Sequence, residues 1–148
     1  MKKLPTIEDL ELTDSYHDIF SQYKFHKKLG KGGFGRVFEA TRLKDGFQVA
    51  IKVSSKADCS AGRMKTMRRE ADVHKNLDHP CIIKYYDFLE SQKNIYIVME
   101  IARGGDIRGL IELRKQAREF LPEEEIKIIA LRVLEGLKYL HDKDYCHR

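Results

Sequence analysis

A cluster of glycines near the start of the chain has the spacing of a ligand-binding loop. Residues 30–35 read Gly-Lys-Gly-Gly-Phe-Gly, a GxGxxG spacing. In a dinucleotide-binding fold such glycines lead into a helix, and a Walker A loop would continue into Gly-Lys-Ser/Thr. Here they lead into residues 37–40, Val-Phe-Glu-Ala, which alternate like a strand. The spacing predicts a glycine hairpin between two strands, either a plain flexible turn or a loop whose backbone amides lie over the phosphates of a nucleotide.

A lysine interrupts an otherwise apolar strand shortly afterwards. Residues 49–53 read Val-Ala-Ile-Lys-Val, and the two-residue repeat of a strand places Ala50 and Lys52 on the same face. A small residue beside an ammonium group suits a flat apolar base above Ala50 and phosphate oxygens near Lys52. The alternative is a lysine that extends from the edge of a half-solvated sheet.

A glutamate in the following segment is a candidate partner for this lysine. Residues 61–77 predict a helix because Met64, Met67, Ala71, His74 and Leu77 recur at helical spacing. On a helical wheel Glu70 falls between His74 and Leu77, inside this stripe. An unpaired carboxylate facing the core would cost about 3–5 kcal/mol, so we expect an ion pair between Glu70 and Lys52. The alternative is a solvated stripe edge where Glu70 contacts Arg69.

The remaining elements follow from alternation and from turn residues. Two helices are expected after the strands, one capped by Asp106 and reaching about Lys115, the other starting at Pro122 and running to Leu140. Strands are expected over residues 23–29, 36–42, 47–53, 82–90 and 95–100, with turns at 44–46 and 91–94. The order predicts an α+β fold: a five-stranded antiparallel sheet with one inserted helix, followed by helices.

In this order and spacing, the motifs resemble a eukaryotic-type protein kinase domain over residues 23–148. Residues 30–37 resemble the family's Gly-rich loop, residues 49–52 (VAIK) the strand that carries its phosphate lysine, and Glu70 the glutamate that pairs with this lysine. Further matching segments are residues 77–83 (LDHPCII), 97–102 (IVMEIA), 104–106 (GGD) and 139–148 (YLHDKDYCHR). The resemblance implies an N-terminal extension (1–22), an N-lobe (23–100), a hinge (101–105) and the start of a helical C-lobe (106–148).

The resemblance also implies a role for each matching residue. Lys52 would hold the α- and β-phosphates of ATP, oriented by Glu70. Val37 and Ala50 would cover the adenine, whose edge the hinge backbone would read. Within this site, Met99 would stand behind the base, Glu100 and Ala102 would supply the hinge backbone, and Asp106 would reach the ribose. The expected nucleotide-binding residues are Leu29, Gly30, Lys31, Gly32, Gly33, Phe34, Gly35, Val37, Ala50, Lys52, Met99, Glu100, Ala102 and Asp106.

The last residues resemble the start of the family's catalytic loop. His147 and Arg148 match the first two members of the His-Arg-Asp motif. The catalytic aspartate and the residues that hold Mg²⁺ would follow Arg148. The implied cofactor is therefore ATP, with Mg²⁺ in the full-length domain, and the implied substrate is a protein hydroxyl, serine or threonine by the family's base rate. We expect the 148 residues alone to be inactive. The alternative is a non-catalytic nucleotide-binding or protein-interaction module produced by truncation.

Composition narrows the remaining classes of function. The chain has 148 residues, 42% of them hydrophobic, and a net charge of +5 whose basic residues are interspersed with acids, which does not favour a nucleic-acid partner. No apolar run is long enough for a membrane helix, and the charged start lacks the pattern of a signal peptide. Three cysteines and the pair His141 and His147 form no closed ligand set, so we expect no metal site. We expect a cytoplasmic or nuclear protein.

Overall fold

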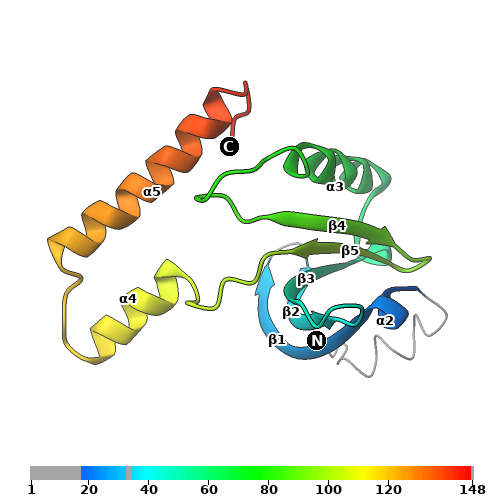
Figure 1. Ribbon diagram of the computed structural model, residues 1–148, viewed down its shortest axis with the longest axis horizontal. Helices are drawn as coiled ribbons and strands as arrows, with labels where there is room; N and C mark the ends of the chain where they lie inside the picture. The colour runs from blue at the N-terminus through cyan, green and yellow to red at the C-terminus, as the bar shows by residue number, and fades with distance from the viewer. Residues whose placement is uncertain (1–17, 33–34, 148) are drawn as a thin grey trace. The chain divides into compact units, whose positions relative to one another are not determined.

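The structure is a computed structural model that describes residues 18–32 and 35–147 (Figure 1). These residues form two compact units. The sheet unit contains residues 18–77 and 84–101, and the helical unit contains residues 78–83 and 102–147. The chain therefore passes into the helical unit for a short loop before it returns to the sheet.

The sheet unit is built on five antiparallel strands in the order β1-β2-β3-β5-β4. The expected α+β fold is confirmed. The strands are β1 (Tyr23–Gly32), β2 (Gly35–Arg42), β3 (Gln48–Ser55), β4 (Tyr85–Glu90) and β5 (Asn94–Met99).

Alternation along the strands explains the core of the sheet unit. In β2 the buried side chains of Phe38 and Ala40 alternate with the partly exposed Val37, Glu39 and Thr41, as the two-residue repeat of a strand requires. Strand β3 pairs with β2 on one side and with β5 on the other, so it is covered from both edges. The buried cluster consists of Ile19, Tyr23, Phe25, Phe38, Ala40, Val49, Ile51, Val53, Tyr96 and Val98.

A short helix ahead of the first strand joins this core. Helix α2 (Asp18–Gln22) buries the Ile19 side chain, which is only 1% exposed. The backbone carbonyl of Gln22 accepts a hydrogen bond from the Leu43 amide at 2.8 Å. Residues 18–22, which we expected to belong to the N-terminal extension, thus pack with the sheet.

Helix α3 (Ala61–His74) lies along strand β4 (Figure 1). Ser60 caps it by accepting a hydrogen bond from the Arg63 amide at 3.2 Å. Met67 and Ala71 are its buried side chains. The helix ends three residues before the predicted Leu77, and β4 starts at Tyr85 instead of the predicted residue 82. Residues 78–83, between them, belong to the helical unit.

The helical unit contains helix α4 (Ile107–Gln116), helix α5 (Glu123–His141) and the loop of residues 78–83. The Tyr139 hydroxyl accepts a hydrogen bond from the Asp78 amide at 3.0 Å, and the rings of His79 and Tyr139 stack with centroids 4.9 Å apart. A Cβ on Gly136 would lie 3.1 Å from the Cys81 carbonyl oxygen. Small size at residue 136 therefore lets the loop lie directly on α5.

Both long helices of this unit expose apolar side chains. The exposed set is Ile107, Ile111 and Leu113 on α4, Phe120 between the helices, and Ile126, Ile128, Leu131, Val133 and Leu134 on α5. No helix among residues 18–32 and 35–147 is both long and apolar enough to cross a membrane.

We predict that Gly35→Ala destabilises the sheet unit. Gly35 has a φ of +152°, and a Cβ there would collide with the Val53 carbonyl oxygen and lie 2.7 Å from Ser54 Oγ. Strain and overpacking together should lower the free energy of unfolding by about 1–3 kcal/mol, measured by urea denaturation. Gly30→Ala is the matched control, because a Cβ on Gly30 meets no atom within 4 Å. Equal losses in the two variants would contradict this explanation.

Candidate functional site

The predicted phosphate lysine and its neighbours share one face of the sheet. Residues paired directly across antiparallel strands point to the same side, and Lys52 is paired with Val37 on β2 and with Ile97 on β5. Ala50, two residues before Lys52, is paired with Met99. Val37, Ala50, Lys52 and Met99 therefore lie on the same face, as the sequence pattern predicted for Ala50 and Lys52.

Exposure on this face suits a ligand that is apolar at one end and anionic at the other. Ala50 is 5% exposed, whereas Val37, Lys52 and Met99 are half-buried. The Lys52 ammonium has no ion pair within residues 18–32 and 35–147. Among the described residues this lysine is thus a partly covered cation without a counter-ion, beside the small side chain of Ala50.

The glycine cluster forms the tip of the β1–β2 hairpin. Gly30 is paired with Val37, Lys31 with Arg36, and Gly32 with Gly35, so the expected glycine hairpin between two strands is observed. Leu29 and Lys31 are exposed. Two of the predicted binding residues, Gly33 and Phe34, lie outside the described residues.

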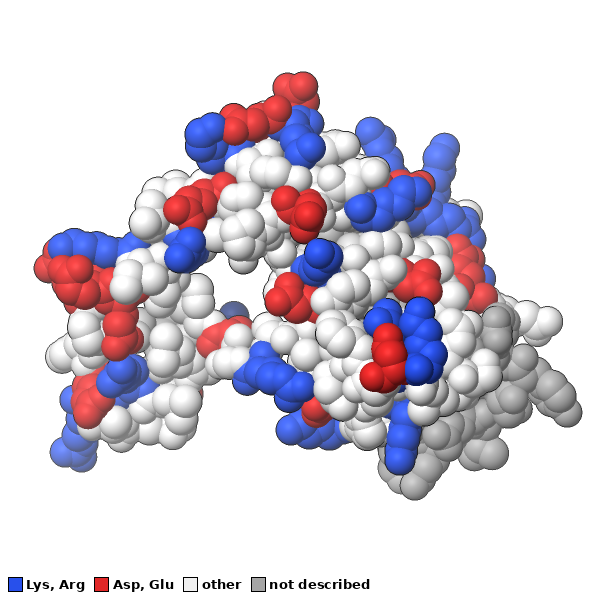
Figure 2. All heavy atoms as spheres, in the orientation of Figure 1, with Lys and Arg blue, Asp and Glu red and all other residues white. Residues whose placement is uncertain are grey.

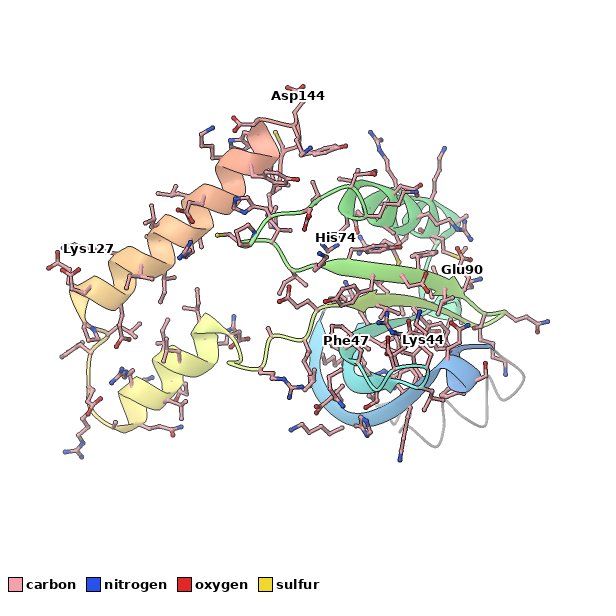
Figure 3. All side chains as sticks on the ribbon, viewed as in Figure 1. Lys44, Phe47, His74, Glu90, Lys127 and Asp144 are labelled. Carbon is pink, nitrogen blue, oxygen red and sulfur yellow. The ribbon has the colours of Figure 1, made fainter. Side chains whose placement is uncertain are left out.

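Helix α3 covers the same face of the sheet. Glu90 is paired with Ile95, and Ile95 with Ser54, two residues along β3 from Lys52, so the side chains of Glu90 and Lys52 leave the same side of the sheet. The Glu90 carboxylate binds the Arg68 guanidinium of α3, with Nε at 2.5 Å and Nη2 at 2.8 Å. Figure 3 shows Glu90 at the end of β4 and His74 near the start of that strand. The ring centroids of His74 and Tyr85 lie 5.6 Å apart.

The predicted ion pair between Glu70 and Lys52 is absent from the described part of the chain. Glu70 is exposed. The buried line of α3 runs through Met67 and Ala71, and Glu70 lies about 80° around the helix from the centre of that line. The stripe that we predicted was therefore too wide at this edge. Glu70 is solvated, as the alternative held, but no contact with Arg69 accompanies it among the described residues.

The first predicted hinge residue, Glu100, directly follows strand β5. The Glu100 amide donates a hydrogen bond to the Lys84 carbonyl at 2.8 Å, and its carboxylate accepts one from the Lys84 amide at 3.0 Å. Since this N–H group is used inside the sheet unit, Glu100 would contact a base through its carbonyl group. The other predicted hinge residue, Ala102, belongs to the helical unit and is exposed.

Two further predicted residues lie in the helical unit. Asp106 is the N-cap of α4, and its Oδ1 accepts a hydrogen bond from the Gly109 amide at 2.7 Å. The cap confirms its predicted structural role, while its contact with a ribose stays a prediction. His147 is exposed, and Arg148 lies outside the described residues.

Sequence reasoning missed a cluster of three charged residues that consists of Glu90, Arg68 and Lys56. Besides Arg68, the carboxylate binds the Lys56 ammonium at 2.9 Å, and Lys56 also donates to the Ser91 carbonyl at 2.6 Å. Hydrogen bonds from Arg68, and then from Lys56, hold the pKa of Glu90 at about 2, below its usual 4.5. No periodic pattern links these three positions, so the cluster becomes visible only once α3 and β4 are folded together.

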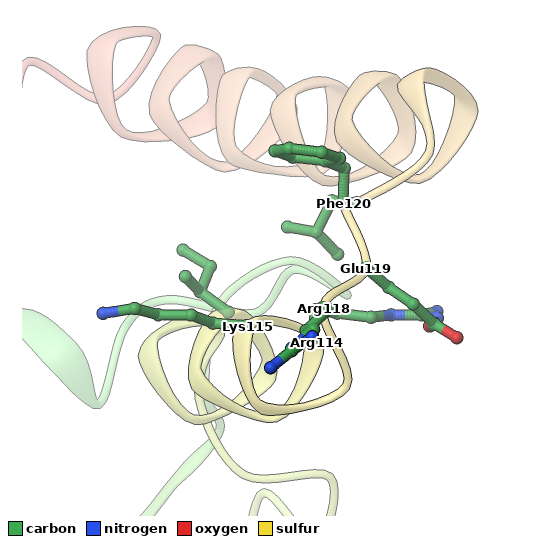
Figure 4. Close-up of a pocket in the computed structure, with 7 residues that line it drawn as sticks. Arg114, Lys115, Arg118, Glu119 and Phe120 are labelled. Carbon is green, nitrogen blue, oxygen red and sulfur yellow. The ribbon is translucent and has the colours of Figure 1, made fainter.

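A pocket of about 440 Å³ in the helical unit is lined by α4 and by residues 118–121, which follow it (Figure 4). Its charged lining includes Arg114, which binds Glu119 at 2.8 Å and Glu125 at 3.0 Å. Its lining residues are Ile111, Arg114, Lys115, Arg118, Glu119, Phe120 and Leu121. None of them is a predicted nucleotide-binding residue, so this pocket is separate from the candidate site.

On the face drawn in Figure 2, charges of both signs are mixed. Basic and acidic side chains lie next to one another there in several places. Among residues 18–32 and 35–147, no group of histidine, cysteine, aspartate or glutamate side chains is arranged to hold a metal ion.

Comparison with known proteins gives a consistent result. A family model described as "Protein kinase domain" matches residues 23–148. The chain is 36% identical over 136 residues to "Serine/threonine-protein kinase PLK4" of Aedes aegypti, and 31% identical over 135 residues to "Maternal embryonic leucine zipper kinase" of Xenopus laevis. It is 33% identical over 151 residues to "Testis-specific serine/threonine-protein kinase 4" of Homo sapiens. These alignments cover 90%, 91% and 100% of this chain but 17%, 20% and 45% of the three relatives.

The low pKa of Glu90 predicts a specific loss of stability in acid. A carboxylate whose pKa is lowered by folding stabilises the fold above its unfolded pKa, and this contribution disappears as the pH falls through the folded pKa. For Glu90 the window runs from about 4.5 down to about 2. The difference in free energy of unfolding between the unsubstituted chain and Glu90→Gln, measured by urea denaturation, should be largest above this window and shrink within it. A difference that is independent of pH would contradict the assignment.

Proposed function

The chain belongs to the protein kinase family, and we propose that its sheet unit carries the phosphate-binding and base-binding wall of an ATP site. The single observation that carries this proposal is the shared face of Val37, Ala50, Lys52 and Met99, next to the glycine hairpin. A small buried side chain and a cation without a counter-ion lie two residues apart on this face, which is the arrangement that an adenine nucleotide needs.

The residues on this face fit the nucleotide by their chemistry. Lys52 would hold the α- and β-phosphates as a point charge, and the backbone amides of the hairpin would cover them. Val37 and Ala50 would contact the base, with Met99 behind it. Packing within the sheet unit requires glycine at residue 35 but not at residue 30, so a functional requirement for Gly30 would come from the bound ligand.

The proposed reaction of the complete protein is transfer of the γ-phosphate of ATP to serine or threonine hydroxyls of protein substrates. Two of the relatives described above are named serine/threonine-protein kinases, which supports this substrate class. Because the chain spans less than half the length of these relatives, the reaction belongs to the whole protein. Bound Mg²⁺ would neutralise the phosphate charge, and its ligands would come from residues after Arg148.

The exposed Glu70 is the observation that favours the alternative function. In the family, the lysine and the helix glutamate act as a pair, whereas here Glu70 is exposed and no ion pair joins it to Lys52 among the described residues. A non-catalytic nucleotide-binding module would tolerate this arrangement permanently, whereas an active kinase would close the pair when it binds ATP.

We predict that Lys52→Ala weakens ATP binding by this chain. A charge-assisted contact to phosphate contributes about 1.5–3 kcal/mol, so the affinity for a fluorescent ATP analogue should fall by about tenfold or more. Lys44→Ala is the control, since Lys44 is an exposed lysine on the β2–β3 turn. Equal affinity in both variants would place the phosphate site elsewhere.

We predict that phosphoryl transfer requires residues beyond Arg148. In an assay with labelled ATP and a generic protein substrate, the 148 residues should transfer no phosphate, because positioning of the hydroxyl and of the metal is missing. The full-length protein should be active, and Lys52→Met should remove most of that activity. If the 148 residues transfer phosphate and Lys52→Met abolishes this activity, the assignment of the missing chemistry to residues beyond Arg148 is wrong.

A further inference from the structure

Glu90 joins three segments that are separate in the sequence. Its carboxylate binds Arg68 of α3 through two nitrogen atoms and Lys56, which follows directly after β3. Lys56 also binds the Ser91 carbonyl in the β4–β5 turn. The Glu90 side chain is 25% exposed and that of Arg68 is 50% exposed, so this is a pair at the surface whose strength comes from its two parallel contacts. One carboxylate therefore links the end of the Lys52 strand to α3.

The two flanks of α3 differ in how they are held. On a helical wheel, Arg68 and Glu70 lie on opposite sides of the buried line through Met67 and Ala71, each about 80° from its centre. Arg68 is bound to Glu90, whereas Glu70 is exposed and has no ion pair in the described part of the chain. The helix is thus fixed on the Arg68 flank and open on the Glu70 flank, above the sheet face that carries Lys52.

We propose that Glu90 is a positioning residue of the nucleotide site, an inference that rests on the proposed function. By holding Arg68 and Lys56, Glu90 fixes one flank of α3 to the sheet. Closure of Glu70 onto Lys52 then needs only a rotation of the helix about that fixed flank. Without the anchor, the whole helix would have to be ordered when nucleotide binds, and this ordering costs conformational entropy that weakens binding. Glu90 touches neither Lys52 nor the ligand, and it acts through Glu70.

The test compares Glu90→Gln in two backgrounds, the unsubstituted chain and Glu70→Gln. The readouts are the affinity for a fluorescent ATP analogue and hydrogen exchange of the α3 amides. Glu90→Gln should weaken the affinity by about threefold to tenfold when Glu70 is present. In the Glu70→Gln background it should cause no further loss, because the residue through which it acts is already gone. Exchange in α3 should be faster in Glu90→Gln than in the unsubstituted chain.

Asp45→Asn provides the matched control. Asp45 binds Arg42 through two nitrogen atoms, with Nε at 3.0 Å and Nη2 at 2.7 Å, on the β2–β3 turn. Loss of this pair should leave both the affinity and α3 exchange unchanged. Glu90→Asp, which keeps the charge, should recover part of the affinity that Glu90→Gln loses.

Each result decides between the explanations. Equal losses of affinity in the two backgrounds would overturn the positioning role, because they would mean that Glu90 only supports the fold. Unchanged affinity and unchanged α3 exchange in Glu90→Gln would overturn it as well. Failure of the unsubstituted chain to bind the analogue would instead overturn the proposed function on which the inference rests, and the two failures are therefore distinguishable.

Discussion

The pairing of β3 with β2 on one side and β5 on the other sets the direction of Val37, Ala50, Lys52 and Met99. Lys52 is locked between Val37 and Ile97, and a slip of one residue in either ladder would turn its ammonium group into the apolar core. The register is held by the fully buried Val49, Ile51 and Val53 on the opposite face. The same apolar side chains that stabilise the sheet thus hold Lys52 on the opposite face, where we propose the nucleotide site.

Helix α3 is held by a different kind of interaction. It buries only Met67 and Ala71, a small apolar area for a helix of 14 residues. Among its other described contacts are the ion pair of Arg68 with Glu90 and the ring contact of His74 with Tyr85, at the two ends of β4. A helix held in this way can change its orientation at a lower cost than one packed by a broad apolar face, because little buried surface is exposed by the movement.

Local patterns predicted the strands, the glycine hairpin, the shared face of Ala50 and Lys52, and the cap at Asp106, because each depends on residues close together in sequence. Three features depend on tertiary contacts and could not be predicted in this way. The exposure of Glu70 depends on how far α3 is rolled over the sheet, and Ile19 becomes a core residue only when α2 meets β1. The loop of residues 78–83 reads as an ordinary break after a helix, yet its partner Tyr139 lies on α5.

The docking of that loop on α5 has a consequence for synthesis on the ribosome. All five strands have emerged once Met99 is outside the exit tunnel, whereas the partner of the Asp78 amide, Tyr139, emerges later. Because domains generally fold from the N-terminus as they emerge, the sheet can assemble while residues 78–83 still lack the helix on which they pack. The nascent chain therefore passes through a stage with a finished sheet and an open loop, and emergence of α5 from the tunnel ends that stage.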